Sequence, residues 1–504
     1  MTRRTGLPAH PHHRPGARRA RWTGALAAAA AVVLAAAGCT PQPDDAGPEP
    51  AEVPAGLERF YAQNAAWESC QGNFECARVE VPLDYAEPDG ETIELAMIRK
   101  RAPMPEGSLL VNPGGPGASG VQLVRNTATS TFSTELRENL HLVGFDPRGV
   151  GESAPVECRT DEQLDQGRAG EPLSIAELGA LCDEKNGEIL AHVDTDSAAR
   201  DLDILRAVNG DQDLRYLGFS YGTKLGAAYA DLFPENVGRM VLDGAMDPTL
   251  GISEVTLAQA ENFQQELHAF VEWCGAEGSC PLSGGVQNGL DELDQIMDRL
   301  EEEPIPVEDG RTFTEEEFVN ALLLPMYDDG WRQSFSEALN ELQREGTAES
   351  LMYLADARSG RLDDGTYADN SWDAFTAINC LDYPEPRVDG AALDRALDDV
   401  SPTLGWYLGG DLSCKDWPAP AVGDLEPAKR LTGDAEALVI GTTGDPATPY
   451  EWAESLAEQL GPNAHLVTYE GHGHTAYGRS NDCITRAVDD FLLDGEAPAE
   501  GLTC

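Results

Sequence analysis

The segment Gly218-Phe219-Ser220-Tyr221-Gly222 constrains the fold of this chain more than any other feature. A strand pattern from Arg215 to Phe219 leads into Ser220, and a helical pattern of small residues from Lys224 to Phe233 follows it. Glycines flank a serine in this way where the chain turns so sharply that the hydroxyl is pushed out at the start of a helix. The letters alone are a weak signal, and the strand and helix around them give the segment its weight. Ser220 is therefore the candidate nucleophile of an α/β protein.

Short apolar runs, glycine loops and helical stretches alternate on both sides of this turn, which is typical of a parallel sheet covered by helices. Beyond the Ser220 region, strands are predicted at 108–111, 141–146, 239–243, 437–440 and 465–469, and a helix at 195–208, with Asp196 or Thr195 as its cap. The alternation stops between Asp247 and Lys429, where helical patterns dominate. A helical insertion between strands of one sheet is expected to cap the strand ends, where ligands bind.

A serine nucleophile needs a histidine base, and three histidines follow the helical insertion. His465 opens a predicted strand, whereas Gly471-His472-Gly473-His474 reads as a glycine loop directly after that strand. The glycines before His474 let the loop turn back toward Ser220, so His474 is the expected base and His472 the alternative.

The acid that orients the base is expected after the preceding strand. Asp445 lies in Gly444-Asp445-Pro446-Ala447-Thr448-Pro449, immediately after that strand, and is the expected acid. Asp243 and Asp247, which follow an earlier strand, are the alternatives. Asp445 could also be a turn-forming Asp before proline.

The oxyanion of a tetrahedral intermediate needs backbone donors. The Tyr221 N–H, directly after Ser220, supplies one. The second is expected from Asn112-Pro113-Gly114-Gly115-Pro116-Gly117, with Gly115 favoured over Gly114.

Charge excludes one class of partner. The chain carries 88 acidic against 35 basic residues, a net charge of −53, which would repel the phosphate backbone of a nucleic acid. Solubility or salt tolerance explains this acidity most simply.

The N-terminal 38 residues are predicted to be a signal peptide. They contain six arginines, no acidic residue and an apolar run from Thr23 to Ala37 that is too short to span a membrane as a helix. The run ends in Ala36-Ala37-Gly38-Cys39, which resembles the bacterial lipoprotein cleavage box and predicts lipidation of Cys39. Ordinary cleavage after the alanines is the alternative. Residues 39–56 are expected to be a disordered, Pro-rich acidic tether that joins the folded chain to the outer face of the cell membrane.

Ten cysteines remain if Cys39 carries lipid, and they fall in neighbouring pairs along the chain. Disulfides persist outside the cytoplasm, so five bridges are predicted. The expected pairs are Cys70 with Cys76, Cys158 with Cys182, Cys274 with Cys280, Cys380 with Cys414, and Cys483 with Cys504.

Seven motifs in order carry a resemblance to a known family. They are 112–117 (NPGGPG), 146–153 (DPRGVGES), 218–223 (GFSYGT), 241–244 (VLDG), 377–380 (AINC), 445–449 (DPATP) and 473–474 (GH). Together they resemble the secreted tripeptidyl aminopeptidases of actinobacteria, which are α/β-hydrolases related to prolyl aminopeptidases. The similarity runs from about Trp67 to Cys504. One departure is Asn112, which stands where many prolyl aminopeptidases have histidine, and it argues against strict proline specificity.

The resemblance implies an α/β-hydrolase fold with a core of residues 57–247 and 430–504 and a helical cap of residues 248–429. It also implies Ser220, Asp445 and His474 as a catalytic triad that releases short peptides, expected to be tripeptides, from free N-termini through an acyl-enzyme. No cofactor is expected, peptides are the expected partners, and a monomer is the expected state. A cell-envelope carboxylesterase or a serine endopeptidase is the alternative on the same fold, and a non-catalytic binding lipoprotein is a more distant one.

An exopeptidase must also hold the α-ammonium group of its substrate, which calls for a carboxylate in the cap. Asp382 is the first candidate for this role, with Glu261 and Glu266 as rivals on a helical stretch. Arg148, in the Asp-x-Arg-Gly loop, is expected to tie loops together through its guanidinium group.

Overall fold

The computed structural model describes residues 53–504 except 171, 385–389 and 410–413. The predicted signal peptide, Cys39 and most of the predicted tether lie outside the described residues.

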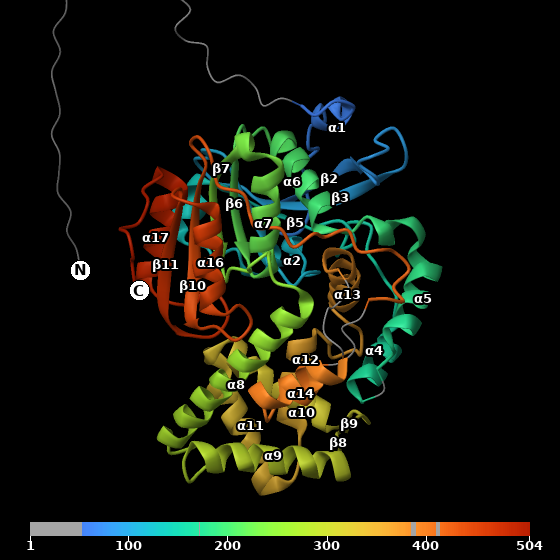
Figure 1. The fold of residues 1–504 in the computed structure, drawn as a ribbon, viewed down its shortest axis with the longest axis vertical. Coiled ribbons are helices and arrows are strands. Elements are labelled where there is room, and N and C mark those ends of the chain that lie inside the picture. Colours follow the sequence, from blue (N-terminus) through green and yellow to red (C-terminus); the bar gives the residue numbers. More distant parts are fainter. Residues whose placement is uncertain (1–52, 171, 385–389, 410–413) are drawn as a thin grey trace, which may run out of the picture. The chain divides into compact units, whose positions relative to one another are not determined.

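Nine strands of the described chain form one sheet in the order β1-β2-β3-β5-β4-β6-β7-β10-β11 (Figure 1). The strands are β1 (Glu68–Ser69), β2 (Phe74–Pro82), β3 (Thr92–Lys100), β4 (Ser108–Asn112), β5 (His141–Phe145), β6 (Leu214–Phe219), β7 (Val237–Asp243), β10 (Glu436–Gly444) and β11 (Ala464–His472). All neighbours from β5 to β11 pair in parallel, and β1, β2 and β3 extend the sheet by antiparallel pairing. The predicted α/β-hydrolase fold with a mostly parallel sheet is confirmed.

Helices cover both faces of this sheet, because the apolar side chains of its strands point to both. In β4, Leu110 packs in the cluster that contains α6, α7 and α16, whereas Leu109 and Val111 pack in the cluster of α2, α3 and α17. The bounds of these helices are α2 (Gly120–Thr127), α3 (Thr134–Asn139), α6 (Thr195–Asn209), α7 (Tyr221–Leu232), α16 (Tyr450–Leu460) and α17 (Asp482–Asp494).

Two local predictions differ from the structure. The N-cap of α6 is Asp194, whose carboxylate accepts the Ser197 N–H at 2.8 Å, rather than Asp196 or Thr195. A carboxylate bonds a free amide in the first turn only from the residue before the helix. Strand β11 continues through Gly471 to His472, because Gly444 of β10 still pairs with His472, so the loop begins only at Gly473.

The remaining elements lie before the sheet, between β5 and α6, between α7 and β7, and between β7 and β10. They are α1 (Glu58–Tyr61), α4 (Asp161–Arg168), α5 (Ile175–Asn186), η1 (Gly187–Ala191), η2 (Pro234–Asn236), α8 (Ile252–Ala276), α9 (Val286–Glu302), β8 (Ile305–Pro306), β9 (Thr312–Phe313), α10 (Glu315–Tyr327), η3 (Asp329–Trp331), α11 (Arg332–Glu345), α12 (Glu349–Ser359), α13 (Ser371–Asp382), α14 (Gly390–Val400) and α15 (Gly405–Leu408).

The insertion between β7 and β10 does not pack as one unit. Helices α8 to α12 bury side chains such as Phe270, Phe318 and Phe335 in a cluster of their own. Helix α13 and Trp417, in contrast, pack in the cluster that lies on the sheet. The predicted cap of residues 248–429 therefore divides into a helical part with its own core and a later part that belongs to the sheet, because Ala374, Ala377 and Ile378 give α13 an apolar stripe toward it.

Five disulfides join the ten cysteines of the described chain in the pairs expected from their order. They are Cys70–Cys76, Cys158–Cys182, Cys274–Cys280, Cys380–Cys414 and Cys483–Cys504. Among the described residues, no helix combines the length and the apolar character that a bilayer crossing requires.

Candidate active site

Ser220 occupies a strained turn between β6 and α7. Its φ of +56° and ψ of −124° lie in a region that residues with a side chain rarely adopt. The Ser220 N–H donates to the Asp243 carbonyl at 2.9 Å, which fixes the turn to the end of β7. Gly218 and Gly222 face each other so closely that a Cβ on Gly218 would lie 2.4 Å from the Gly222 oxygen. Only glycine fits there, which is the steric reason for the Gly-x-Ser-x-Gly spacing.

The loop after β4 lies directly against this serine. A Cβ on Gly114 would lie 2.9 Å from the Ser220 Cβ and 3.0 Å from the Tyr221 nitrogen. The Gly114 N–H already donates to Asn112 Oδ1 at 2.8 Å, whereas no partner occupies the Gly115 N–H among the described residues. Tyr221 is the first residue of α7, where backbone N–H groups have no partner within the helix. Tyr221 and Gly115 therefore remain the candidate oxyanion donors.

His474 and Asp445 form a close pair at the carboxyl ends of β10 and β11. The His474 Nδ1 lies 2.9 Å from Asp445 Oδ1 and 3.0 Å from Oδ2. The Asp445 carboxylate is buried and also accepts the N–H groups of Ala447, Thr448 and Thr475 at 2.8–3.1 Å. Burial by itself would raise the pKa of Asp445, but the His474 charge and these hydrogen bonds outweigh it and hold the pKa below its usual value. Asp445 is thus kept ionised beside the imidazole.

The ring of His474 reaches the same end of the sheet as Ser220. A Cβ on Gly244 would lie 3.3 Å from His474 Cε1, and Gly244 directly follows Asp243, whose carbonyl holds the Ser220 amide. The opposite side of the ring is covered by the insertion: Tyr327, the last residue of α10, packs edge-on against His474 with ring centroids 5.6 Å apart. The Tyr327 carbonyl accepts the His474 N–H at 2.7 Å. Nothing in the sequence pattern pointed to Tyr327.

The alternative acids and base have other partners. The Asp243 carboxylate accepts the Ala476 and Tyr477 N–H groups at 2.7–3.0 Å, and burial raises its pKa to about 6. Asp247 accepts hydrogen bonds from Thr249, Ser455 and Gln459.

His472 pairs with Glu266 of α8, with Nδ1 2.9 Å from Oε1. The hydrogen bond that His472 donates to Glu266 raises the pKa of His472. The structure therefore places His474, and not His472, beside the candidate acid.

The three carboxylates expected to hold a substrate ammonium group are not arranged for it. Asp382 is 4% exposed and is engaged by the Thr195 N–H at 2.9 Å and by Lys224 Nζ at 3.2 Å. Glu266 is equally buried and lies between His472 and Arg332. Gln259 of α8 donates its amide N–H to the Ala447 carbonyl, in the loop that carries Asp445. Glu261 is exposed and lies about 200° around α8 from Gln259. Two of the three predicted ammonium ligands thus have cationic partners within the chain, and Glu261 lies on another side of α8 from Gln259.

The expected role of Arg148 is confirmed. Its guanidinium group is fully buried, pairs with both oxygens of Asp201 at 2.7 Å, and donates to the carbonyls of Pro82, Leu83 and His192. It ties the end of β2 and the loop before α6 to α6 itself.

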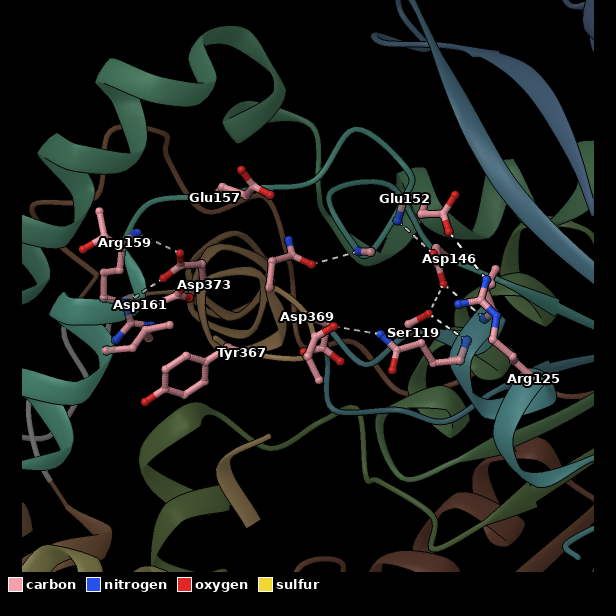
Figure 2. Close-up of a pocket in the computed structure, with 17 residues that line it drawn as sticks. Ser119, Arg125, Asp146, Glu152, Glu157, Arg159, Asp161, Tyr367, Asp369 and Asp373 are labelled. Atoms are coloured by element: carbon pink, nitrogen blue, oxygen red, sulfur yellow. Dashed lines mark hydrogen bonds and ion pairs between the residues drawn. The ribbon is translucent and has the colours of Figure 1, made fainter. Parts of the chain in front are cut away.

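A separate cavity of about 600 Å³ lies beside α2, α4 and the start of α13 (Figure 2). Its charged groups largely bond one another: the Ser119 hydroxyl donates to Asp146, and Arg159 pairs with Asp373 at 2.7 Å (Figure 2). None of Ser220, Asp445 and His474 lines this cavity.

The known proteins that this chain resembles include several named as hydrolases. A family profile described as "TAP-like protein" matches residues 402–504. The chain is 33% identical to the serine protease Hip1 of Mycobacterium tuberculosis over 95% of this chain and 96% of that protein. It is 36% identical to carboxylesterase B of the same species over 88% of this chain and 90% of the relative.

A third relative is named for the activity that the seven sequence motifs suggested. The chain is 30% identical to the tripeptidyl aminopeptidase of Streptomyces coelicolor over 87% of this chain and 85% of that enzyme. The chain belongs to the TAP-like family of α/β-hydrolases. As a TAP-like hydrolase it is a serine hydrolase, and the resemblance carried by the seven sequence motifs is confirmed.

Proposed function

We propose that this TAP-like hydrolase releases short peptides, tripeptides in the first instance, from the free N-termini of peptides. The observation that carries the proposal is the buried Asp445–His474 pair at 2.9 Å, on the same sheet edge as the strained Ser220. The tripeptidyl aminopeptidase relative supports the choice of substrate.

The proposed chemistry is acyl transfer through a covalent intermediate. His474 takes the proton of the Ser220 hydroxyl as the oxygen attacks the peptide carbonyl, and Asp445 stabilises the imidazolium that forms. The Tyr221 and Gly115 N–H groups hold the oxyanion. His474 then protonates the leaving amine, and water repeats the cycle to release the short peptide and restore Ser220.

The proposed cap consists of the insertion 248–429 over a core of residues 57–247 and 430–504. Contacts from α8 and α10 to the His474 loop support a cap that encloses the reacting groups. Such a cover would exclude bulk water and restrict substrates to peptides and unfolded termini.

The test compares one peptide series with free and with N-acetylated N-termini, alongside a short-chain ester, using wild-type protein and Ser220→Ala. We expect tripeptide release from free N-termini only, and its loss in Ser220→Ala. Equal cleavage of acetylated peptides would instead identify an endopeptidase. Turnover of the ester alone would identify a carboxylesterase, the second candidate, which the carboxylesterase B relative favours.

We also propose that the enzyme acts at the outer face of the cell membrane, anchored by lipid on Cys39. Five disulfides support a location outside the cytoplasm, because disulfides persist in oxidising compartments. Mass spectrometry of the mature N-terminus tests the anchor: a diacylated Cys39 is expected, and an unmodified N-terminus within the alanine run would contradict it.

A further inference from the structure

Arg358 of α12 lies between two aromatic rings at the candidate active site. Its Cζ is 4.8 Å from the centroid of the Tyr327 ring and 5.8 Å from that of Trp372. The Trp372 indole is fixed in turn, since its N–H donates to the Ser359 carbonyl at 3.0 Å. Two rings that flank a guanidinium group limit its rotation and leave its N–H edges for hydrogen bonding.

These two rings belong to segments that contact the two halves of the catalytic apparatus. Tyr327 packs on the His474 ring and accepts its backbone N–H. Trp372 lies in the first turn of α13, which packs against the loop of residues 112–117 that contains Gly115. A Cβ on Gly117 of this loop would lie 2.6 Å from the Ser371 oxygen. Arg358 is thus held between the end of α10, which contacts His474, and the start of α13, which lies behind the loop that contains Gly115.

Arg358 has no anionic partner among the described residues, whereas several other partly buried arginines there do. Its Nε is buried without a hydrogen-bond partner, and within the described part of the chain no carboxylate forms an ion pair with its guanidinium group. Asp356, two residues away on the same helix, instead directs its oxygens at Arg168 and Arg311 at 2.6–2.7 Å.

The charge of the chain sharpens this contrast, because acidic residues outnumber basic ones by 88 to 35. In such a sequence, an acidic side chain of the same chain could readily pair with a partly buried arginine. An unpaired buried N–H is costly unless a ligand satisfies it.

We propose that Arg358 binds a carboxylate of the substrate, either the C-terminal carboxylate of a short peptide or an acidic side chain near the scissile bond. The inference rests on the proposed function, since it places this carboxylate in the cleft of a peptidase. A guanidinium fork pairs with a carboxylate through two parallel N–H···O bonds, which fixes the orientation of the ligand as well as its charge. The substrates preferred are then short peptides that place a carboxylate at this position, despite the negative charge of the enzyme as a whole.

Binding is measured in the Ser220→Ala protein, which holds peptides without turning them over. Three peptides of one length separate the two sources of carboxylate: a neutral peptide amide, its free acid, and the amide with Glu replacing Gln. We expect calorimetry to show that the free acid or the Glu peptide binds about 10- to 100-fold more tightly than the neutral amide, since bonds to charged groups have that strength.

Adding Arg358→Gln removes this preference while leaving the affinity for the neutral amide within about twofold, and Arg358→Lys restores part of it. Arg344→Gln is the matched control, because Arg344 is exposed on α11 and the change removes the same charge from the insertion. Thermal unfolding checks that each variant is folded.

Equal affinity of Ser220→Ala for acid and amide peptides, or a preference that survives Arg358→Gln, would overturn the proposal. The proposed peptidase activity is tested separately, since it would be contradicted by an absence of product from the wild-type enzyme. The ratio of acid to amide affinities does not depend on turnover.

Discussion

At the residue scale, the site depends on strain at Ser220 that its neighbours make tolerable. A serine with φ of +56° costs free energy, and the bond from its N–H to the Asp243 carbonyl helps to hold it. Glycine positions matter as much as the reactive side chains, since the absence of a Cβ at Gly114, Gly218 and Gly222 allows backbone segments to meet at Ser220. Residues that a pattern search treats as spacers are therefore part of the active-site geometry.

Asp445→Asn should abolish most of the activity without unfolding the protein. The amide can no longer hold the His474 Nδ1–H or stabilise an imidazolium ion, so we expect kcat to fall by roughly 10⁴-fold. Steady-state kinetics on a cleaved peptide measure the effect, and circular dichroism checks the fold.

Asp243→Asn serves as the comparison, because Asp243 is a buried acid that bonds the Ala476 and Tyr477 amides instead of the imidazole. This variant should lose thermal stability and much less kcat. A larger loss of kcat in Asp243→Asn than in Asp445→Asn would show that the acid is misassigned.

At the scale of elements, helices of the insertion hold the end of β11 and the loop that follows it. Helix α10 ends with Tyr327 against His474, and α8 contributes Glu266 to His472. Arg479 adds a further link, since it donates to the His472 carbonyl and pairs with Asp329. Movement of these helices would consequently alter the position of the base.

The His472–Glu266 pair predicts a pH dependence of stability. The pKa of His472 is raised above the unfolded value near 6.5, first by the hydrogen bond with Glu266, with Arg332 acting against it and Asp329 with it. A raised histidine pKa stabilises the fold fully below about pH 6.5, and this contribution is lost as pH rises through the folded-state pKa.

Wild type should therefore melt at a higher temperature than His472→Gln at pH 6, and the difference should shrink by pH 9. Differential scanning calorimetry at both pH values provides the measurement, with His268→Gln, an exposed histidine on α8, as control. A difference that is constant or grows with pH would rule out the charged pair.

At the scale of the whole molecule, stability reflects a balance between negative charge and covalent links. A net charge of −53 opposes a compact state by self-repulsion. Five disulfides act in the other direction by restricting the unfolded chain.

Salt should stabilise this protein. Raising NaCl from about 0.01 M to about 0.15 M shortens the screening length from roughly 30 Å to 8 Å, which weakens repulsion across the surface. Exposed pairs such as Arg78–Glu152 also weaken, but pairs of that kind contribute at most about 1 kcal/mol each. We expect a rise in Tm by calorimetry that is equal for NaCl and KCl at the same ionic strength, and a fall in Tm would show that attractive pairs dominate.

Local patterns along the chain were enough to predict the secondary-structure elements and the candidate chemistry. Strand and helix periodicity predicted the sheet, and the glycines around Ser220 predicted the turn, because steric demands act between residues close in the chain. Spacing after the last two strands likewise singled out Asp445 and His474, since parallel strands end at one edge.

Only the tertiary structure decided which distant side chains meet. Asp382 looked available as a carboxylate, but Lys224 and Thr195 neutralise it from elements more than 150 residues away in the chain. Tyr327 and Arg358 gave no signal in the sequence, and they lie at the site because the insertion folds back onto the loop after β11. Periodicity records which face of an element is apolar, whereas the partner of a charged group depends on long-range packing that no local pattern contains.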